Sequence, residues 1–289
     1  MRILLTGASG ELGAYLLDRL MAANHDIVAW SGSAKGSRQG VAFRPVDLAD
    51  PPATDQAIEA ADPDVILHAA AISSAEGVRR DPLRARRVNV DATARLSDWA
   101  DRRGRRVVFT STDLVFDGSK AWNREDDPAR PVLAYGVTKR EAELAVLATT
   151  RGVVARLSLL YGPSRCGRPS YFDQSIEALR RGEPRSFFED EYRTPLDLAT
   201  AAEVLAHLVE GKFRGTIHVG GRERLSRFEL IRRVAACVGI DPALVRSGRR
   251  ADVASPEPRP ADVSLDTSLL ASTFPDLARP SVEGAWPAG

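Results

Sequence analysis

The chain contains few cysteines and no long apolar run. Its 289 residues include two cysteines, Cys166 and Cys237, which lack metal-ligand spacing, so we expect free thiols in a reducing compartment. No stretch of about 18 apolar residues occurs, which predicts that no segment spans a membrane. The apolar run at the start is too short for a signal peptide. Together these absences predict a soluble cytoplasmic protein.

An excess of charge of either sign is also absent, because 40 lysines and arginines oppose 39 carboxylates for a net charge of +1. A surface that binds nucleic acid would need a larger positive excess. The positive charge is almost all arginine, since the only lysines are Lys35, Lys120, Lys139 and Lys212. The four histidines form no pair with metal-ligand spacing, so we predict no catalytic metal. We expect neither nucleic acid nor membrane as a partner.

Short β-branched runs alternate with helical stretches up to about residue 160. Each run is nearly unbroken in apolar residues, as in central strands that are covered on both faces. The predicted strands are Arg2–Leu5, Asp26–Trp30, Val65–His68, Arg106–Ser111 and Val153–Leu157. The predicted helices between them are Glu11–Ala23, about Pro82–Arg103, and Ala134–Thr149. This alternation predicts an α/β fold with a doubly wound parallel Rossmann sheet.

Prolines break the later half of the chain into shorter pieces. Two helices are still predicted, at Leu198–Glu210 and at Arg227–Val238, and the second opens with a capping box from Ser226 to Glu229. The segment Ser247–Pro260 has the composition of a surface loop. We therefore predict a Rossmann domain over residues 1–160, to which residues of about 196–220 return. Residues 161–289 are expected to form mainly a smaller C-terminal lobe.

A glycine-rich turn joins the first predicted strand to the first helix. Its glycines allow a tight turn, close approach of a pyrophosphate, and packing of the helix against its strand. The helix N-terminus adds unpaired N–H groups and a partial positive charge, both of which favour phosphate. The sequence thus predicts a dinucleotide site formed by Gly7, Ser9, Gly10, Glu11, Leu12 and Gly13.

The segment after the second strand distinguishes NAD from NADP, and here it contains no carboxylate. An acidic residue at this place binds the ribose 2′-hydroxyl of NAD and would repel the 2′-phosphate of NADP. The segment carries hydroxyls and cations instead, at Ser31, Ser33, Lys35 and Arg38. Charge complementarity favours NADP(H), with NAD(H) as the alternative, and makes residues 1–160 the predicted NADP-binding domain. The adenine rim is expected at Asp47 and Leu48.

Tyr135 and Lys139 are four residues apart, which places both on one face of the predicted helix. A cation one turn away is expected to lower the pKa of the phenol and make it a better proton donor to a carbonyl. The preceding strand brings hydroxyls to the carboxyl edge of the sheet, where ligands bind and a carbonyl can be oriented. Spacing alone leaves three candidate hydroxyls, Thr110, Ser111 and Thr112. The pattern is typical of a carbonyl reductase.

Motifs over nearly the whole chain resemble those of the extended short-chain dehydrogenase/reductases and, within them, the dTDP-4-dehydrorhamnose reductases. They are Thr6–Gly13, His68–Ala71, Val88–Val90, Ser111–Gly118, Tyr135–Lys139, Tyr192–Pro195 and Arg259–Ser268. The resemblance implies that Thr112 is the catalytic hydroxyl, with Tyr135 as acid and Lys139 as its partner. It also implies a cofactor side formed by Ala69, Ala70, Ala71 and Asn89, where Asn89 holds the active-site helix. Substrate contacts are implied for Thr112, Phe116, Arg193 and Arg259.

The chain departs from this family's pattern at several positions. Leu114 replaces a tyrosine that shapes the sugar pocket, while Ser9 and Glu11 replace the usual asparagine and glutamine. Nucleotide-sugar dehydratases place a glutamate where Leu114 stands, so a dehydratase is not predicted. The predicted function is NADPH-dependent reduction of the 4-keto group of a nucleotide-linked deoxysugar held by the C-terminal lobe. An epimerase with bound NAD, a non-catalytic NADP-binding regulatory subunit and a homodimer remain open.

Overall fold

A computed structural model describes residues 1–286. Within these residues, eight strands form one sheet in the order β12-β7-β6-β5-β1-β2-β4-β3. All neighbours are parallel except β3 and β4, which are antiparallel. The strands are β1 (Arg2–Thr6), β2 (Asp26–Ser31), β3 (Ser37–Arg38), β4 (Val41–Pro45), β5 (Val65–His68), β6 (Arg106–Thr112), β7 (Gly152–Leu157) and β12 (Gly215–Val219). The predicted doubly wound α/β fold is confirmed.

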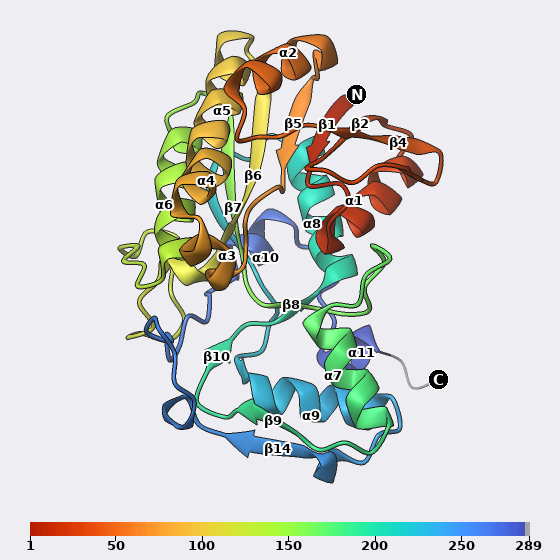
Figure 1. The fold of residues 1–289 in the computed structure, drawn as a ribbon, viewed down its shortest axis with the longest axis vertical. Helices are drawn as coiled ribbons and strands as arrows, with labels where there is room; N and C mark the ends of the chain where they lie inside the picture. Colours follow the sequence, from red (N-terminus) through yellow and green to blue (C-terminus); the bar gives the residue numbers. More distant parts are fainter. Residues whose placement is uncertain (287–289) are drawn as a thin grey trace.

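Helices cover both faces of this sheet (Figure 1). On one face, α1 (Glu11–Ala22) packs against α8 (Leu198–Glu210), and their apolar side chains form one core cluster with the strands. On the other face, a second cluster joins the strands to α2 (Pro51–Ala61), α5 (Ala92–Arg102) and α6 (Ala134–Leu147). Because both faces are covered, every residue of β5, β6 and β7 is buried, which explains their nearly unbroken apolar runs.

The predicted helix over about Pro82–Arg103 is interrupted. It consists of α4 (Pro82–Arg86), a π-helical turn over Arg87–Asp91, and α5, and a short helix α3 (Ala75–Arg80) precedes it. Its start agrees with the prediction, because the side chain of Asp81 accepts a hydrogen bond from the backbone N–H of Arg84. The wider turn is centred on Asn89, whose role in the site is described below.

The later half adds a smaller group of elements at the other end of the molecule (Figure 1). They are α7 (Tyr171–Arg180), β9 (Arg185–Phe188), α9 (Arg227–Cys237), β14 (Val245–Gly248) and α11 (Val282–Ala285), which share a third apolar cluster. Short pieces complete it and connect it to the sheet: β8 (Leu160–Tyr161), β10 (Tyr192–Arg193), β11 (Leu196–Asp197), β13 (Leu225–Ser226) and α10 (Ser268–Thr273). The predicted capping box of Ser226 and Glu229 opens α9.

The predicted surface loop over Ser247–Pro260 is wrong at its beginning. Ser247 and Gly248 continue β14, which pairs with β9, and Arg250–Asp252 forms a 3-10 turn. The backbone of Ser247 and Gly248 therefore pairs with a neighbouring strand rather than with water, whereas residues 251–256 are exposed, as expected for a surface loop.

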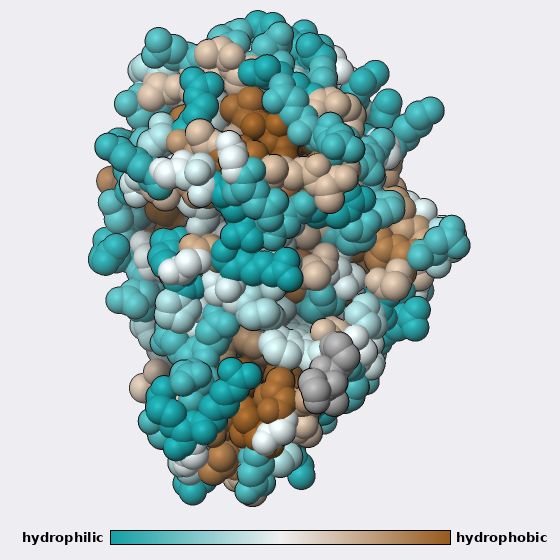
Figure 2. All heavy atoms as spheres, turned by 90° about the vertical axis from the view of Figure 1, so that its right-hand side faces the viewer, coloured by the Kyte–Doolittle hydropathy of each residue, from teal (hydrophilic) through white to brown (hydrophobic). Residues whose placement is uncertain are grey.

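No helix among residues 1–286 is long and apolar enough to cross a membrane. The face drawn in Figure 2 is mostly hydrophilic, and its apolar side chains gather in separate areas in the upper and lower parts of the view.

Candidate active site

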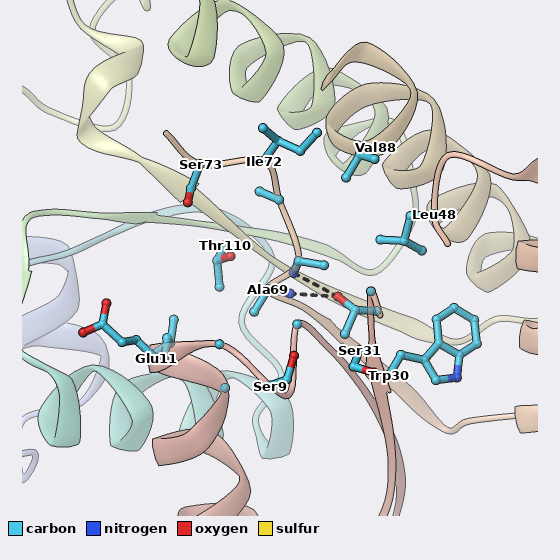
Figure 3. Close-up of a pocket in the computed structure, with 18 of the residues that line it drawn as sticks. Ser9, Glu11, Trp30, Ser31, Leu48, Ala69, Ile72, Ser73, Val88 and Thr110 are labelled. Carbon is cyan, nitrogen blue, oxygen red and sulfur yellow. Dashed lines mark hydrogen bonds between the residues drawn. The ribbon is translucent and has the colours of Figure 1, made fainter. Parts of the chain in front are cut away.

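A cavity of about 520 Å³ opens at the carboxyl ends of β1, β2, β5 and β6. In Figure 3, Glu11 lies toward one end of this cavity, and Trp30 and Leu48 lie toward the other. Many of the predicted site residues line it: Gly7, Ser9, Gly10, Glu11, Leu12, Gly13, Ser31, Asp47, Leu48, Ala69, Ala70, Ala71, Tyr135 and Lys139. We call it the cofactor cavity below.

The glycine-rich turn forms one wall of the cofactor cavity. Gly7 has a φ of +72°, and a Cβ built there would lie 2.8 Å from the backbone nitrogen of Ala70. A Cβ at Gly13 would collide with the carbonyl oxygen of Gly7. Gly10 caps α1 without a side-chain hydrogen bond, which leaves the first N–H groups of the helix available. The turn has the shape and polarity that a phosphate group requires.

Buried hydrogen bonds connect this turn to the neighbouring strand. The hydroxyl oxygen of Thr6 accepts from the backbone N–H groups of Ala69 and Ala70, both at 3.1 Å (dashed lines in Figure 3). It also lies 2.7 Å from Nδ1 of His68, whose Nε2 lies 2.9 Å from the hydroxyl of Thr93. Because Thr93 donates to a backbone carbonyl, His68 must donate from Nε2 and accept at Nδ1. Burial lowers the pKa of His68 to about 3, so the ring is neutral as this pattern requires.

Asn89 links the cofactor cavity to helix α6 without lining the cavity itself. Its side-chain oxygen accepts from the backbone N–H of Ile72 at 2.8 Å, and its amide donates to the carbonyl of Ile72 at 3.1 Å. The same amide donates to the hydroxyl of Thr138 at 3.0 Å. Ile72 lines the cavity and Thr138 lies on α6 beside Lys139, so Asn89 fixes the distance between the two walls.

Tyr135 and Lys139 lie on α6 and both line the cofactor cavity. The amine of Lys139 is buried and lies 3.9 Å from the centre of the Phe109 ring. Burial lowers the pKa of Lys139 to about 7, although the carboxylate of Glu143 acts in the opposite direction. The expected lowering of the Tyr135 pKa is not found. Loss of water, together with the charge of Asp113, raises the pKa of this phenol above its ordinary value.

The three candidate hydroxyls at the end of β6 have different partners. Thr110 donates to the carbonyl of His68 at 3.3 Å, and Ser111 donates to the buried carboxylate of Glu143 at 2.6 Å. Both residues line the cofactor cavity. Thr112 does not appear in its wall. Its hydroxyl accepts from the backbone N–H of Leu114 at 3.2 Å and caps the short helix Asp113–Val115.

A buried charge cluster begins at Asp113, the residue after Thr112. The guanidinium of Arg193 lies 3.5 Å from the carboxylate of Asp113 and 3.2 Å from that of Glu191. Glu191 also pairs with Arg227 at 2.7 Å. Burial raises the pKa of Asp113, and the charge of Arg193 opposes this effect. Phe116 is 2% exposed and packs in a small apolar cluster, Arg193 is buried among the carboxylates, and neither lines the cofactor cavity.

Two further cavities continue from the cofactor cavity toward the smaller group of elements. The first shares Glu11 and Leu160 with the cofactor cavity and is also lined by aromatic side chains and Arg227. The second shares Arg227 with the first and contains Arg259, whose guanidinium lies 5.0 Å from the Phe188 ring centre. Sequence reasoning missed Arg227 because tertiary packing alone brings α9 beside the other elements that line these cavities.

The predicted cations for a 2′-phosphate are not gathered at the cofactor cavity. Ser33 and Lys35 are exposed outside its wall, and Arg38 pairs with Asp18 at 2.7 Å. Arg84, which was not predicted, lines the cavity and pairs with Asp47 at 2.9 Å. Trp30 and Arg168 were missed as well, since neither belongs to a recognisable motif. Residues 1–286 contain no group of three or more His, Cys, Asp or Glu that could hold a metal ion.

The fold and the cavity together define an oxidoreductase of the extended short-chain dehydrogenase/reductase type. The chain belongs to the RmlD substrate binding domain family, whose model matches residues 1–283.

Similar proteins from different organisms carry different names. Methionine adenosyltransferase 2 subunit beta of Bos taurus is 30% identical over 278 residues, which cover 93% of this chain and 81% of that protein. A probable dTDP-4,6-dihydroxy-2-methyloxan-3-one 4-ketoreductase of Streptomyces antibioticus is 30% identical over 90% of this chain and 85% of that protein. The crystal structure of a hypothetical dTDP-4-dehydrorhamnose reductase from Sulfolobus tokodaii has a TM-score of 0.83 at 29% identity, covering 98% and 99% of the two chains.

Proposed function

We propose that this protein reduces the 4-keto group of a nucleotide-linked deoxysugar with NADPH. The observation that carries the proposal is that Tyr135 and Lys139 line the same cavity as the glycine-rich turn. A proton donor and a dinucleotide site thus share one cavity, which carbonyl reduction requires. The similarity to a probable 4-ketoreductase and to a hypothetical dTDP-4-dehydrorhamnose reductase supports this choice of substrate.

The residues of the cofactor cavity fit a nicotinamide dinucleotide. The pyrophosphate would lie at Gly10 and the open N–H groups of α1, while Trp30 and Leu48 would flank the adenosine end. The only carboxylate that lines this end among residues 1–286, Asp47, is paired with Arg84 and so presents little repulsion to a 2′-phosphate. The missing acidic residue after β2 favours NADP over NAD.

The side chains of α6 and β6 supply the acid and the orientation. The bound cofactor supplies the hydride that adds to the carbonyl carbon. Tyr135 donates its phenolic proton to the carbonyl oxygen, which completes the alcohol and leaves a phenolate. Thr112 orients the carbonyl by a hydrogen bond once its hydroxyl, which donates to the carboxylate of Asp113, turns toward the substrate. The ammonium form of Lys139 stabilises the phenolate and, as an acid with a pKa of about 7, returns a proton.

The two neighbouring cavities offer a place for the sugar nucleotide. Aromatic side chains and Arg227 line the first, and Arg227 with Arg259 line the second, so stacking surfaces alternate with cations that suit a base and a diphosphate. We propose that residues 161–289 supply most of this substrate site. Arg193 would then have an indirect role outside this substrate site, because it holds the carboxylate of Asp113 next to Thr112.

A second candidate is a regulatory subunit that binds NADP without turnover. The similarity to methionine adenosyltransferase 2 subunit beta favours it, because that protein is named as a subunit of another enzyme.

The two candidates are separated by following NADPH absorbance with dTDP-4-dehydrorhamnose, with a reaction lacking the sugar as the control. The reductase oxidises NADPH only when the sugar is present. Tight NADPH binding without sugar-dependent oxidation would instead support the regulatory subunit. Repeating the assay with NADH tests the cofactor preference.

A further inference from the structure

A loop from the later half of the chain lies against the glycine-rich turn. It covers residues 162–170, between β8 and α7. The hydroxyl of Tyr15 donates to the carbonyl of Pro163 at 2.8 Å, and the backbone N–H of Ser164 donates to Asp173 at 3.1 Å. Arg165 lies with its guanidinium 4.1 Å from the Tyr15 ring centre and 3.3 Å from the carboxylate of Asp18. The loop is thereby held on helix α1.

Arg168 is the residue of this loop that reaches the cofactor cavity. Its guanidinium donates one hydrogen bond to the backbone carbonyl of Ser9 at 3.1 Å and lines the cavity wall. Within residues 1–286 it forms no ion pair, in contrast to Arg165 three residues earlier. An arginine has five N–H donors, so most of those of Arg168 stay available.

The position of Arg168 beside the start of α1 indicates which ligand its free N–H donors could bind. Ser9 precedes Gly10, the N-cap of α1, whose first N–H groups are open to the cavity. A pyrophosphate bound there would lie at the N-terminus of α1, in the cavity that the guanidinium also lines. Arginine suits such a group because its planar fork binds two phosphate oxygens at once.

We propose that Arg168 binds the pyrophosphate of the dinucleotide and closes the cofactor cavity over it. This inference rests on the proposed cofactor and extends it by a cation outside the glycine-rich motif. Its ligand is the diphosphate that NADPH and NADH share, rather than the 2′-phosphate that only NADPH carries. Loss of the Arg168 side chain therefore weakens the binding of both nucleotides by the same factor.

The test measures dissociation constants of NADPH and NADH by calorimetry for the full chain and the variants Arg168→Ala, Arg168→Lys and Arg165→Ala. We expect Arg168→Ala to weaken both nucleotides about tenfold or more, as for the loss of a hydrogen bond to a charged group. Arg168→Lys retains the charge without the planar fork, so its dissociation constants should lie between those of the wild type and of Arg168→Ala. Arg165→Ala, on the same loop, leaves in place the hydrogen bond from Tyr15 to Pro163 that also holds the loop on α1, so it should leave both constants within about twofold.

Unchanged constants in Arg168→Ala overturn the inference. Weakening of NADPH alone also overturns it, because the contact would then be with the 2′-phosphate. Equal losses in Arg165→Ala and Arg168→Ala would assign the effect to the loop rather than to the guanidinium. If the wild-type chain binds neither nucleotide, the proposed cofactor itself is wrong, which is a separate outcome from a wild type that binds and an Arg168→Ala variant that binds equally well.

Discussion

Replacing Lys139 with methionine should stabilise the protein while removing its proposed activity. The amine is buried, and its pKa falls from the ordinary 10.5 to about 7. At about 1.4 kcal/mol for each pKa unit, burying the charged form costs about 5 kcal/mol. The contact of the ammonium with the Phe109 ring offsets part of this cost, and entry of water reduces the cost further. Methionine has a similar length and no charge, so we expect a gain of at least about 2 kcal/mol in the free energy of unfolding at pH 7.

The stability gained by Lys139→Met should depend on pH. Between pH 7 and pH 10.5 the unfolded chain holds a proton on Lys139 that the folded chain has released, so wild-type stability rises with pH in this window. The Lys139→Met variant lacks this contribution, and its advantage should shrink as the pH approaches 10. Urea denaturation at pH 7 and pH 9.5 measures both effects. Lys120→Met is the control, because that lysine is exposed and pairs with Asp127 at the surface. A Lys139→Met protein that is no more stable than wild type at pH 7, or an advantage that is constant with pH, would refute the reasoning.

Two further changes test the turn and the core under α6. Gly13→Ala places a Cβ against the backbone of the turn, so it should lower the melting temperature and reduce cofactor affinity at least about tenfold in a binding titration, whereas Gly32→Ala, with no atom within 4 Å, should leave the melting temperature unchanged. Equal melting temperatures of the two variants would contradict the steric account. Glu143→Gln leaves the buried Arg156 without its partner at 3.0 Å and should lower the free energy of unfolding by about 3 kcal/mol in urea, while exposed Glu141→Gln should change it by less than about 0.5 kcal/mol. A loss at Glu143 no larger than that at Glu141 would mean that the buried pair contributes little.

The sheet and the cofactor turn could be predicted because their signals are local. The predicted strand Val65–His68 has the observed bounds, and the helix from Glu11 ends one residue earlier than expected. Unbroken apolar runs mark strands covered on both faces, and a glycine-rich turn between strand and helix has one main use. The prolines after residue 160 were more difficult to interpret. Because of these prolines α7 was not predicted, although Ser170 and Asp173 form a capping box at its start.

Features that depend on tertiary packing could not be predicted from spacing. The π-helical turn contains Asn89, whose side chain bonds the backbone of Ile72 on another segment. Arg38 was expected at the cofactor, but Asp18 on α1 lies close enough to pair with it. The raised pKa of Tyr135 follows from burial, which a helical spacing of four residues does not express. Each of these depends on which side chains surround a group in space.

The rate of sugar-dependent NADPH oxidation in Tyr135→Phe tests whether Tyr135 is the proton donor of the reduction. Phenylalanine keeps the ring and removes the proton that the carbonyl oxygen needs, so NADPH binding should be retained while turnover of dTDP-4-dehydrorhamnose falls at least about a hundredfold. Tyr192→Phe is the matched control, since that ring packs under Arg224 outside the cofactor cavity, and it should keep most of the wild-type rate. A Tyr135→Phe protein that turns over the sugar as fast as wild type would contradict the proposed mechanism.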